Sequence, residues 1–111
     1  MLDKQTVDAL KATYGEDLCV AEGPTVDLVF RKPSRAVWER YQNKNGNDRA
    51  DKSAALRELC LACLVYPGSE ERGPDYQALR DAFEEMPGLP LTIMGELAAM
   101  AGLREDLVKK L

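Results

Sequence analysis

The most apolar run in the chain, Leu56 to Pro67, constrains the fold more than any other stretch. It reads Leu-Arg-Glu-Leu-Cys-Leu-Ala-Cys-Leu-Val-Tyr-Pro. Its apolar residues recur at three- and four-residue spacing, which is the pattern of one helix face. The following Pro67-Gly68 pair cannot continue a helix, and Asp48 is a candidate N-cap. We therefore expect a central, largely buried helix from about Asp48 to Tyr66.

Two short alternating runs precede this helix, at about residues 16–21 and 26–31, with Gly23-Pro24 between them. Alternation of apolar and polar residues around a turn predicts an antiparallel hairpin. A lone hairpin is marginally stable in water, so its apolar face must lie on helices. The residues expected on that face are Leu18, Val20, Val26, Leu28 and Phe30.

Helix signals flank both segments. Asp3 and Ser34 are candidate N-caps, and Gly15 is placed to end the first helix. Pro74 suits the first turn of a later helix, and Thr92 is a candidate cap for the last one. The expected buried stripes of these helices are Val7, Leu10 and Tyr14; Val37, Trp38 and Tyr41; and Tyr76, Leu79, Phe83 and Met86. The predicted fold is a single α+β domain over residues 1–111: an N-terminal helix and one antiparallel β-hairpin, followed by a bundle of four to five helices.

The C-terminal segment, residues 103–111, carries the most suggestive binding feature. Gly102 is expected to interrupt the last helix, after which leucines recur every four residues. Each leucine left in water forgoes about 1.5–3 kcal/mol of burial, so this segment either folds back on the bundle or detaches to meet a partner helix or groove. We expect Met94 and Met100 to be exposed beside it. The candidate partner-binding residues are Met94, Met100, Leu103, Leu107, Val108 and Leu111.

Composition excludes several classes of function. The net charge is −4 and the pI about 4.9, whereas a nucleic-acid binder needs a basic stripe. The one basic cluster, Arg31-Lys32-Pro33-Ser34-Arg35, either meets an acidic partner or phosphate, or protects a strand edge from further pairing. No apolar run reaches the roughly 18 residues of a membrane span, and the N-terminus lacks a signal-peptide core. A cytoplasmic location is therefore expected.

No motif for catalysis or metal binding is evident. The chain has no histidine, which excludes serine–histidine and cysteine–histidine nucleophiles. Cys60 and Cys63 form a Cys-x-x-Cys pair, but only Cys19 remains as a further thiol ligand, and the pair falls near the end of a helix rather than at its start. We expect two buried structural cysteines, no metal, no cofactor and no enzyme.

Several short sequences resemble one family. They are a first helix ending Tyr14-Gly15, Val-Phe-Arg-Lys-Pro-Ser-Arg-Ala at 29–36, a helix with Trp38 and Tyr41, Leu-Cys-Leu-Ala-Cys-Leu-Val-Tyr-Pro at 59–67, Met-Pro-Gly-Leu-Pro at 86–90, and Ala-Gly at 101–102. In this order they resemble the small tail assembly chaperones of long-tailed bacteriophages and prophages.

The resemblance implies a non-catalytic protein that binds the tape measure protein, helps recruit tail tube subunits, and is absent from the finished virion. Two alternatives remain open. One is a small acidic adaptor or inhibitor of phage origin that binds a host protein. The other is a redox or metal module built on Cys60 and Cys63.

Overall fold

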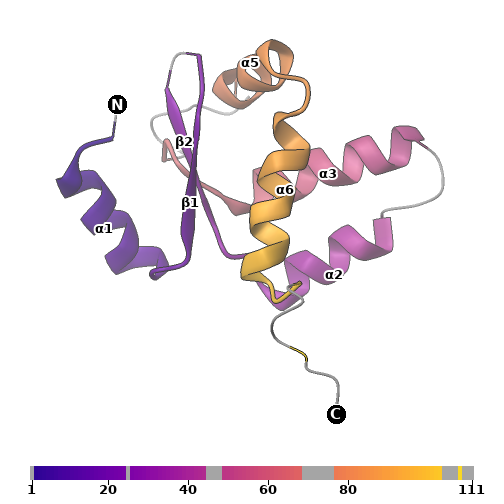
Figure 1. The fold of residues 1–111 in the computed structure, drawn as a ribbon, viewed down its shortest axis with the longest axis horizontal. Helices are drawn as coiled ribbons and strands as arrows, with labels where there is room; N and C mark the ends of the chain where they lie inside the picture. Colours follow the sequence, from indigo (N-terminus) through magenta and orange to yellow (C-terminus); the bar gives the residue numbers. More distant parts are fainter. Residues whose placement is uncertain (1, 25, 45–48, 69–76, 104–107, 109–111) are drawn as a thin grey trace.

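The computed structural model describes residues 2–24, 26–44, 49–68, 77–103 and 108, with the backbone alone described for 49–51. These residues form five helices and a three-stranded antiparallel sheet (Figure 1), which confirms the predicted α+β class. None of these helices is both long and apolar enough to cross a bilayer. The elements in chain order are α1 (Lys4–Tyr14), β1 (Leu18–Glu22), β2 (Asp27–Arg31), α2 (Arg35–Lys44), α3 (Arg49–Cys63), β3 (Leu64–Tyr66), α5 (Gln77–Glu85) and α6 (Leu89–Met100).

The predicted hairpin is present as β1 and β2, and β2 is the central strand of the sheet. Its side chains at Leu28 and Phe30 are fully buried, as expected. The face predicted for β1 is wrong, because Phe30 pairs with Cys19 and Leu28 with Ala21. Cross-strand partners share a face, so Cys19 and Ala21 pack against the core, while Val20 is 57% exposed.

The central helix is shorter than predicted, because α3 ends at Cys63 and the chain continues as β3. Leu64 pairs with Phe30 and Tyr66 with Val29, with an irregularity in the register between them. A short continuous apolar run suits a fully buried strand as well as a buried helix, and periodicity cannot separate the two. The β-branched and aromatic residues that end the run favour the strand. The expected cap of α3, Asp48, lies outside the described residues.

The core lies where one face of the sheet meets α3, α5 and α6. In Figure 1, α6 crosses in front of α3, and α2 packs along α3 below it. Val37, Trp38 and Tyr41 of α2 are half-buried and pack against this core, as does Phe83 of α5, which agrees with the predicted stripes. Tyr76 lies outside the described residues. The buried residues that form the cluster are Leu28, Phe30, Leu59, Cys60, Cys63, Leu64, Leu79, Ala82, Ile93 and Leu97.

The helix ends follow local capping chemistry. The Asp3 carboxylate accepts a hydrogen bond from the Thr6 N–H at 2.7 Å, and this bond lowers the pKa of Asp3. Gly15 ends α1 with φ +95°, a conformation that L side chains rarely adopt. The Thr92 cap is wrong: α6 already begins at Leu89, with Pro90 in its first turn, and the Thr92 hydroxyl donates to the Gly88 carbonyl at 3.4 Å instead. Pro74 lies outside the described residues.

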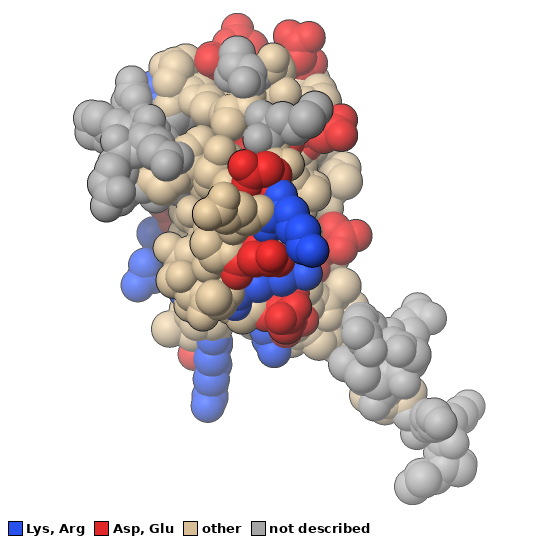
Figure 2. Space-filling model, turned by 90° about the vertical axis from the view of Figure 1, so that its left-hand side faces the viewer, with Lys and Arg blue, Asp and Glu red and all other residues tan. Residues whose placement is uncertain are grey.

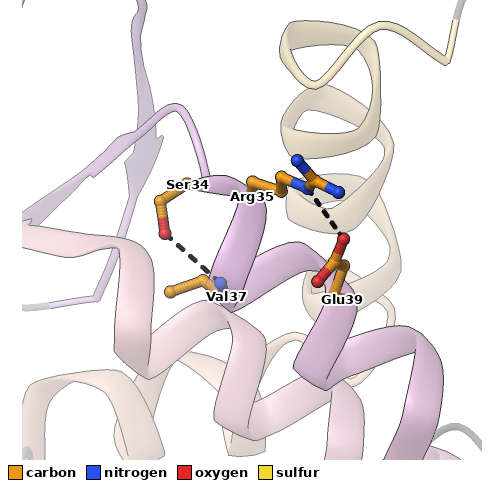
Figure 3. A network of polar contacts seen from close by, with 4 residues as sticks. All are labelled: Ser34, Arg35, Val37 and Glu39. Atoms are coloured by element: carbon orange, nitrogen blue, oxygen red, sulfur yellow. Dashed lines mark hydrogen bonds and ion pairs between the residues drawn. The ribbon is translucent and has the colours of Figure 1, made fainter.

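We expect Ser34→Ala to lower the free energy of unfolding by about 1 kcal/mol. Ser34 Oγ accepts a hydrogen bond from the Val37 N–H at 3.2 Å, which satisfies one otherwise unpaired donor of α2 (Figure 3). Urea denaturation followed by circular dichroism measures the change. Ser53→Ala is the matched control because Ser53 is exposed inside α3, and it should change stability by less than about 0.5 kcal/mol. Equal effects of the two substitutions would contradict a capping role.

Helix α1 lies beside β1 at the left of Figure 1 and has no buried residue. Val7 and Leu10 are half-buried, while Tyr14 is 38% exposed and lies under the Arg31 guanidinium, 5.7 Å from the ring centre. Figure 2 views the molecule from this side, and its acidic and basic side chains are interspersed there rather than segregated. This face therefore offers no basic stripe for nucleic acid.

Candidate functional site

The three cysteines meet in the core. Cys60 and Cys63 are 0% and 1% exposed, and Cys19 on β1 is half-buried and packs against the same cluster. Burial, followed by the neighbouring Cys63 and Cys19, raises the pKa of Cys60 to about 12. Burial also raises the pKa values of Cys19 and Cys63 to about 11. A thiol must ionise before it attacks or binds a metal, so these groups are suited to packing.

Among the described residues, no three or more Cys, Asp or Glu side chains are arranged so that they could hold a metal ion together. A structural zinc would need four ligands, and the described part of the chain does not bring such a set together. The expectation that Cys60 and Cys63 are buried core residues is confirmed, because almost none of either residue is exposed to solvent.

The basic segment 31–35 contains one ion pair, between Arg35 Nε and Glu39 Oε1 at 2.9 Å (Figure 3). Both side chains are mostly exposed, so the pair stabilises the protein little. Arg31 extends over the Tyr14 ring, and Pro33 is buried. The segment therefore joins the sheet to α2, with its charged groups facing solvent.

The C-terminal candidate residues separate into two groups. Met94 and Met100 are half-buried and pack against the core, so the expectation that they are exposed is wrong. Leu103 and Val108 are 72% and 81% exposed. Leu107 and Leu111 lie outside the described residues, as does most of the predicted helix over 103–111; its two described residues, Leu103 and Val108, are not helical.

A glycine-based cap ends α6 before the exposed residues begin. Gly102 has φ +102°, its N–H donates to the Ala99 carbonyl at 3.1 Å, and the Leu103 N–H donates to Ala98 at 2.8 Å. These two bonds form a Schellman motif, which satisfies the last carbonyls of a helix. The predicted interruption at Gly102 is therefore confirmed, and it turns the chain away from the α6 axis.

A groove that the sequence reasoning missed lies between α3, α5 and the start of α6; we call it the α3–α5 groove. It consists of two adjoining hollows, of about 670 and 510 Å³, which share Arg57 and Phe83. Each is in the size range of pockets that hold ligands or side chains. The apolar residues that line the groove are Tyr41, Ala54, Leu56, Leu61, Leu79, Phe83, Pro87, Pro90 and Leu91.

Sequence patterns assign most of these residues to buried helix faces. The groove exists because α5 packs on α6, while α5 and α3 line a hollow that their side chains do not fill. Leu91 is the clearest signal: it is 63% exposed at the start of α6. The sequence shows a leucine next to Pro90, in a segment predicted to turn, but it does not show which surface this leucine joins.

The comparisons with known proteins identify a family and a fold. No curated protein matches the chain. A solved structure, of the uncharacterised protein rbstp2171 from Bacillus stearothermophilus, is similar with a TM-score of 0.65 and 25% sequence identity, over 95% of this chain and 98% of that one. A family model matches residues 10–110. The chain therefore belongs to the family described as "Domain of unknown function (DUF6848)".

Proposed function

We propose that this protein is a non-catalytic tail assembly chaperone of a long-tailed phage or prophage. In this role it binds the tape measure protein in the bacterial cytoplasm and helps recruit tail tube subunits. The single observation that carries the proposal is the pair of large apolar side chains left in solvent after α6, Leu103 and Val108. The sequence resemblance at 29–36 and 59–67 supports the choice of partner.

A tail assembly chaperone must cover apolar surface of its client temporarily. A tape measure protein, as the resemblance implies, is a long helical chain whose apolar stripes need cover until tube subunits polymerise around it. Two mostly exposed apolar side chains on a nine-residue segment with leucines every four residues could supply part of that cover. Their burial against a client would contribute about 1.5–3 kcal/mol each.

We expect the double variant Leu103→Asp, Val108→Asp to recover about tenfold less tape measure protein in a co-expression pull-down than the unchanged chain. A carboxylate cannot enter an apolar contact without a large desolvation cost. Both residues are exposed, so the substitutions should leave the thermal unfolding midpoint nearly unchanged. Ala12→Asp, which adds a carboxylate to the exposed side of α1, is the matched control and should retain the client.

Two other results of this pull-down would contradict the proposal or its contact surface. If the unchanged chain retains no tail protein, the proposed function is wrong, and co-purification of a host enzyme would favour an adaptor or inhibitor, a role compatible with the acidic net charge of −4. If the double variant retains the client fully, the C-terminal segment is not the contact.

A further inference from the structure

The α3–α5 groove combines an apolar floor with open ends. Phe83 stands at its centre, because it lines both hollows. Phe83, Leu56 and Leu61 are only half-buried, and Leu91 is 63% exposed at one end. Apolar side chains in a concave surface between helices are typical of sites that hold the apolar stripe of another helix.

The charged residues around this groove have an excess of one sign. Among the described residues that line the groove, three are basic, Lys52, Arg57 and Arg80, and two are acidic, Glu58 and Glu84. Glu58 is already paired with Lys44, at 2.9 Å. None of the three basic side chains forms an ion pair with another described residue. In a protein of net charge −4, the described lining of the groove thus carries a small basic excess, with three unpaired cations around an apolar floor.

The dimensions suit a short helix. Lys52 to Leu61 spans roughly 14 Å along the α3 axis at 1.5 Å per residue. A partner helix of about 10 residues would cover this length and present three to four apolar side chains on one face. Phe83 and Leu91 would contact that face, and Arg57 would lie beside it.

The charge of the chain's own C-terminal segment does not complement this groove. Residues 104–110 contain three basic side chains, Arg104, Lys109 and Lys110, and two acidic ones, Glu105 and Asp106, for a net charge of +1. That segment also follows the far end of α6, whereas the groove lies at its beginning, roughly 18 Å away along the helix axis. In Figure 1 α6 runs downward, away from α5, which lies at the top.

We infer that the α3–α5 groove binds an amphipathic helix of the partner whose apolar stripe is flanked by Asp and Glu side chains. The inference rests on the proposed function only in taking that helix to belong to the chaperone's client. The apolar stripe packs on Phe83, Leu56 and Leu91, and the flanking carboxylates pair with Lys52, Arg57 and Arg80. This is a second contact surface, at the opposite end of α6 from the exposed Leu103.

The test uses two labelled peptides of about 14 residues with the same leucine stripe at i, i+3, i+4, i+7 and i+11. One carries Glu on both flanks of the stripe and the other carries Lys. Fluorescence anisotropy with the full chain should give a Kd about tenfold lower for the Glu peptide, and the difference should shrink at high salt. Equal affinity for the two peptides, or preference for the Lys peptide, would overturn the inference.

Variants assign the binding to the groove. Arg57→Glu should weaken the Glu peptide about tenfold and reverse the preference toward the Lys peptide. Leu91→Asp should weaken it to a similar degree, and Asp is tolerated in the first turn of a helix, so α6 should still form. Arg40→Glu, the same change at an exposed site of α2 that lines neither hollow, is the matched control and should leave Kd unchanged.

Two other occupants would show themselves in the same samples. If the chain dimerises on sedimentation and Arg57→Glu makes it monomeric, a second copy occupies the groove and the inference is wrong. It is equally wrong if removal of residues 104–111 increases peptide affinity about tenfold, because the chain's own segment then competes for the groove.

The inference and the proposed function fail separately. If the Glu peptide binds in the groove but no tape measure protein is retained, the client is misidentified and the groove's chemistry stands. If the tape measure protein is retained equally by the unchanged chain and by Arg57→Glu and Leu91→Asp, the groove inference fails and the chaperone role stands.

Discussion

Replacing Phe30 with alanine is expected to lower the free energy of unfolding by about 3–5 kcal/mol. Phe30 is 0% exposed on the central strand and pairs with Cys19 on one side and Leu64 on the other. Its removal leaves a cavity where the sheet meets α3 and α6, which the neighbouring helices can fill only in part. Since small domains have about 5–15 kcal/mol of stability in total, much of the protein's stability should be lost. Urea denaturation followed by circular dichroism measures it.

The control for this substitution is Val20→Ala, in the neighbouring strand of the same sheet. Val20 is 57% exposed, so its truncation removes mainly strand propensity and should cost less than about 1 kcal/mol. If both substitutions had the same small effect, Phe30 would not lie at the centre of the core.

Raising the pH above about 9 is expected to destabilise the protein steeply. Cys60 and Cys63 have pKa values of about 12 and about 11 in the folded protein, against 9.0 for an ordinary thiol. Between pH 9 and 11 the unfolded chain therefore loses protons that the folded chain keeps, so stability falls as pH rises. Each of the two thiols lowers the free energy of unfolding by up to about 1.4 kcal/mol per pH unit, and the two together by up to about 2.7 kcal/mol per pH unit. Denaturation midpoints at pH 8, 9 and 10 measure the slope.

The double variant Cys60→Ala, Cys63→Ala is the control, because it removes two of the three thiols with raised pKa values and keeps Cys19. Its stability should fall much less with pH than that of the unchanged chain. Thiol labelling near pH 8 adds a second check: both cysteines should react only after unfolding. Rapid labelling of the native protein, or identical pH slopes for the two chains, would contradict the buried-thiol interpretation and reopen a redox role.

The sequence was informative where the signal was local. Asp3, Ser34 and Gly102 act at helix ends as their side chains or backbone freedom predict, because capping depends on residues within one or two turns. The hairpin of β1 and β2 follows in the same way from alternation around a turn. The burial of Cys60 follows from helical spacing within an apolar run.

The errors arose where distant segments compete for one surface. The run that ends at Tyr66 is apolar on every side, so nothing in its period distinguishes the last turn of a helix from a strand. Strand β2 offers an unpaired edge there, and pairing with it satisfies the backbone of β3. The same strand decides which face of β1 is buried, because Ala21 and Cys19 are the cross-strand partners of Leu28 and Phe30 and therefore lie on the same, buried face of the sheet.

By itself, the sequence determined the α+β class, the hairpin, the caps at Asp3, Ser34 and Gly102 and the buried thiols, all of which depend on short-range chemistry. Only the tertiary structure decided the third strand, the half-burial of Met94 and Met100, and the α3–α5 groove. The groove joins Arg57, Phe83 and Leu91 from three helices. Residues that far apart in a chain become neighbours only when helices pack, and packing depends on the combined shape of all their side chains.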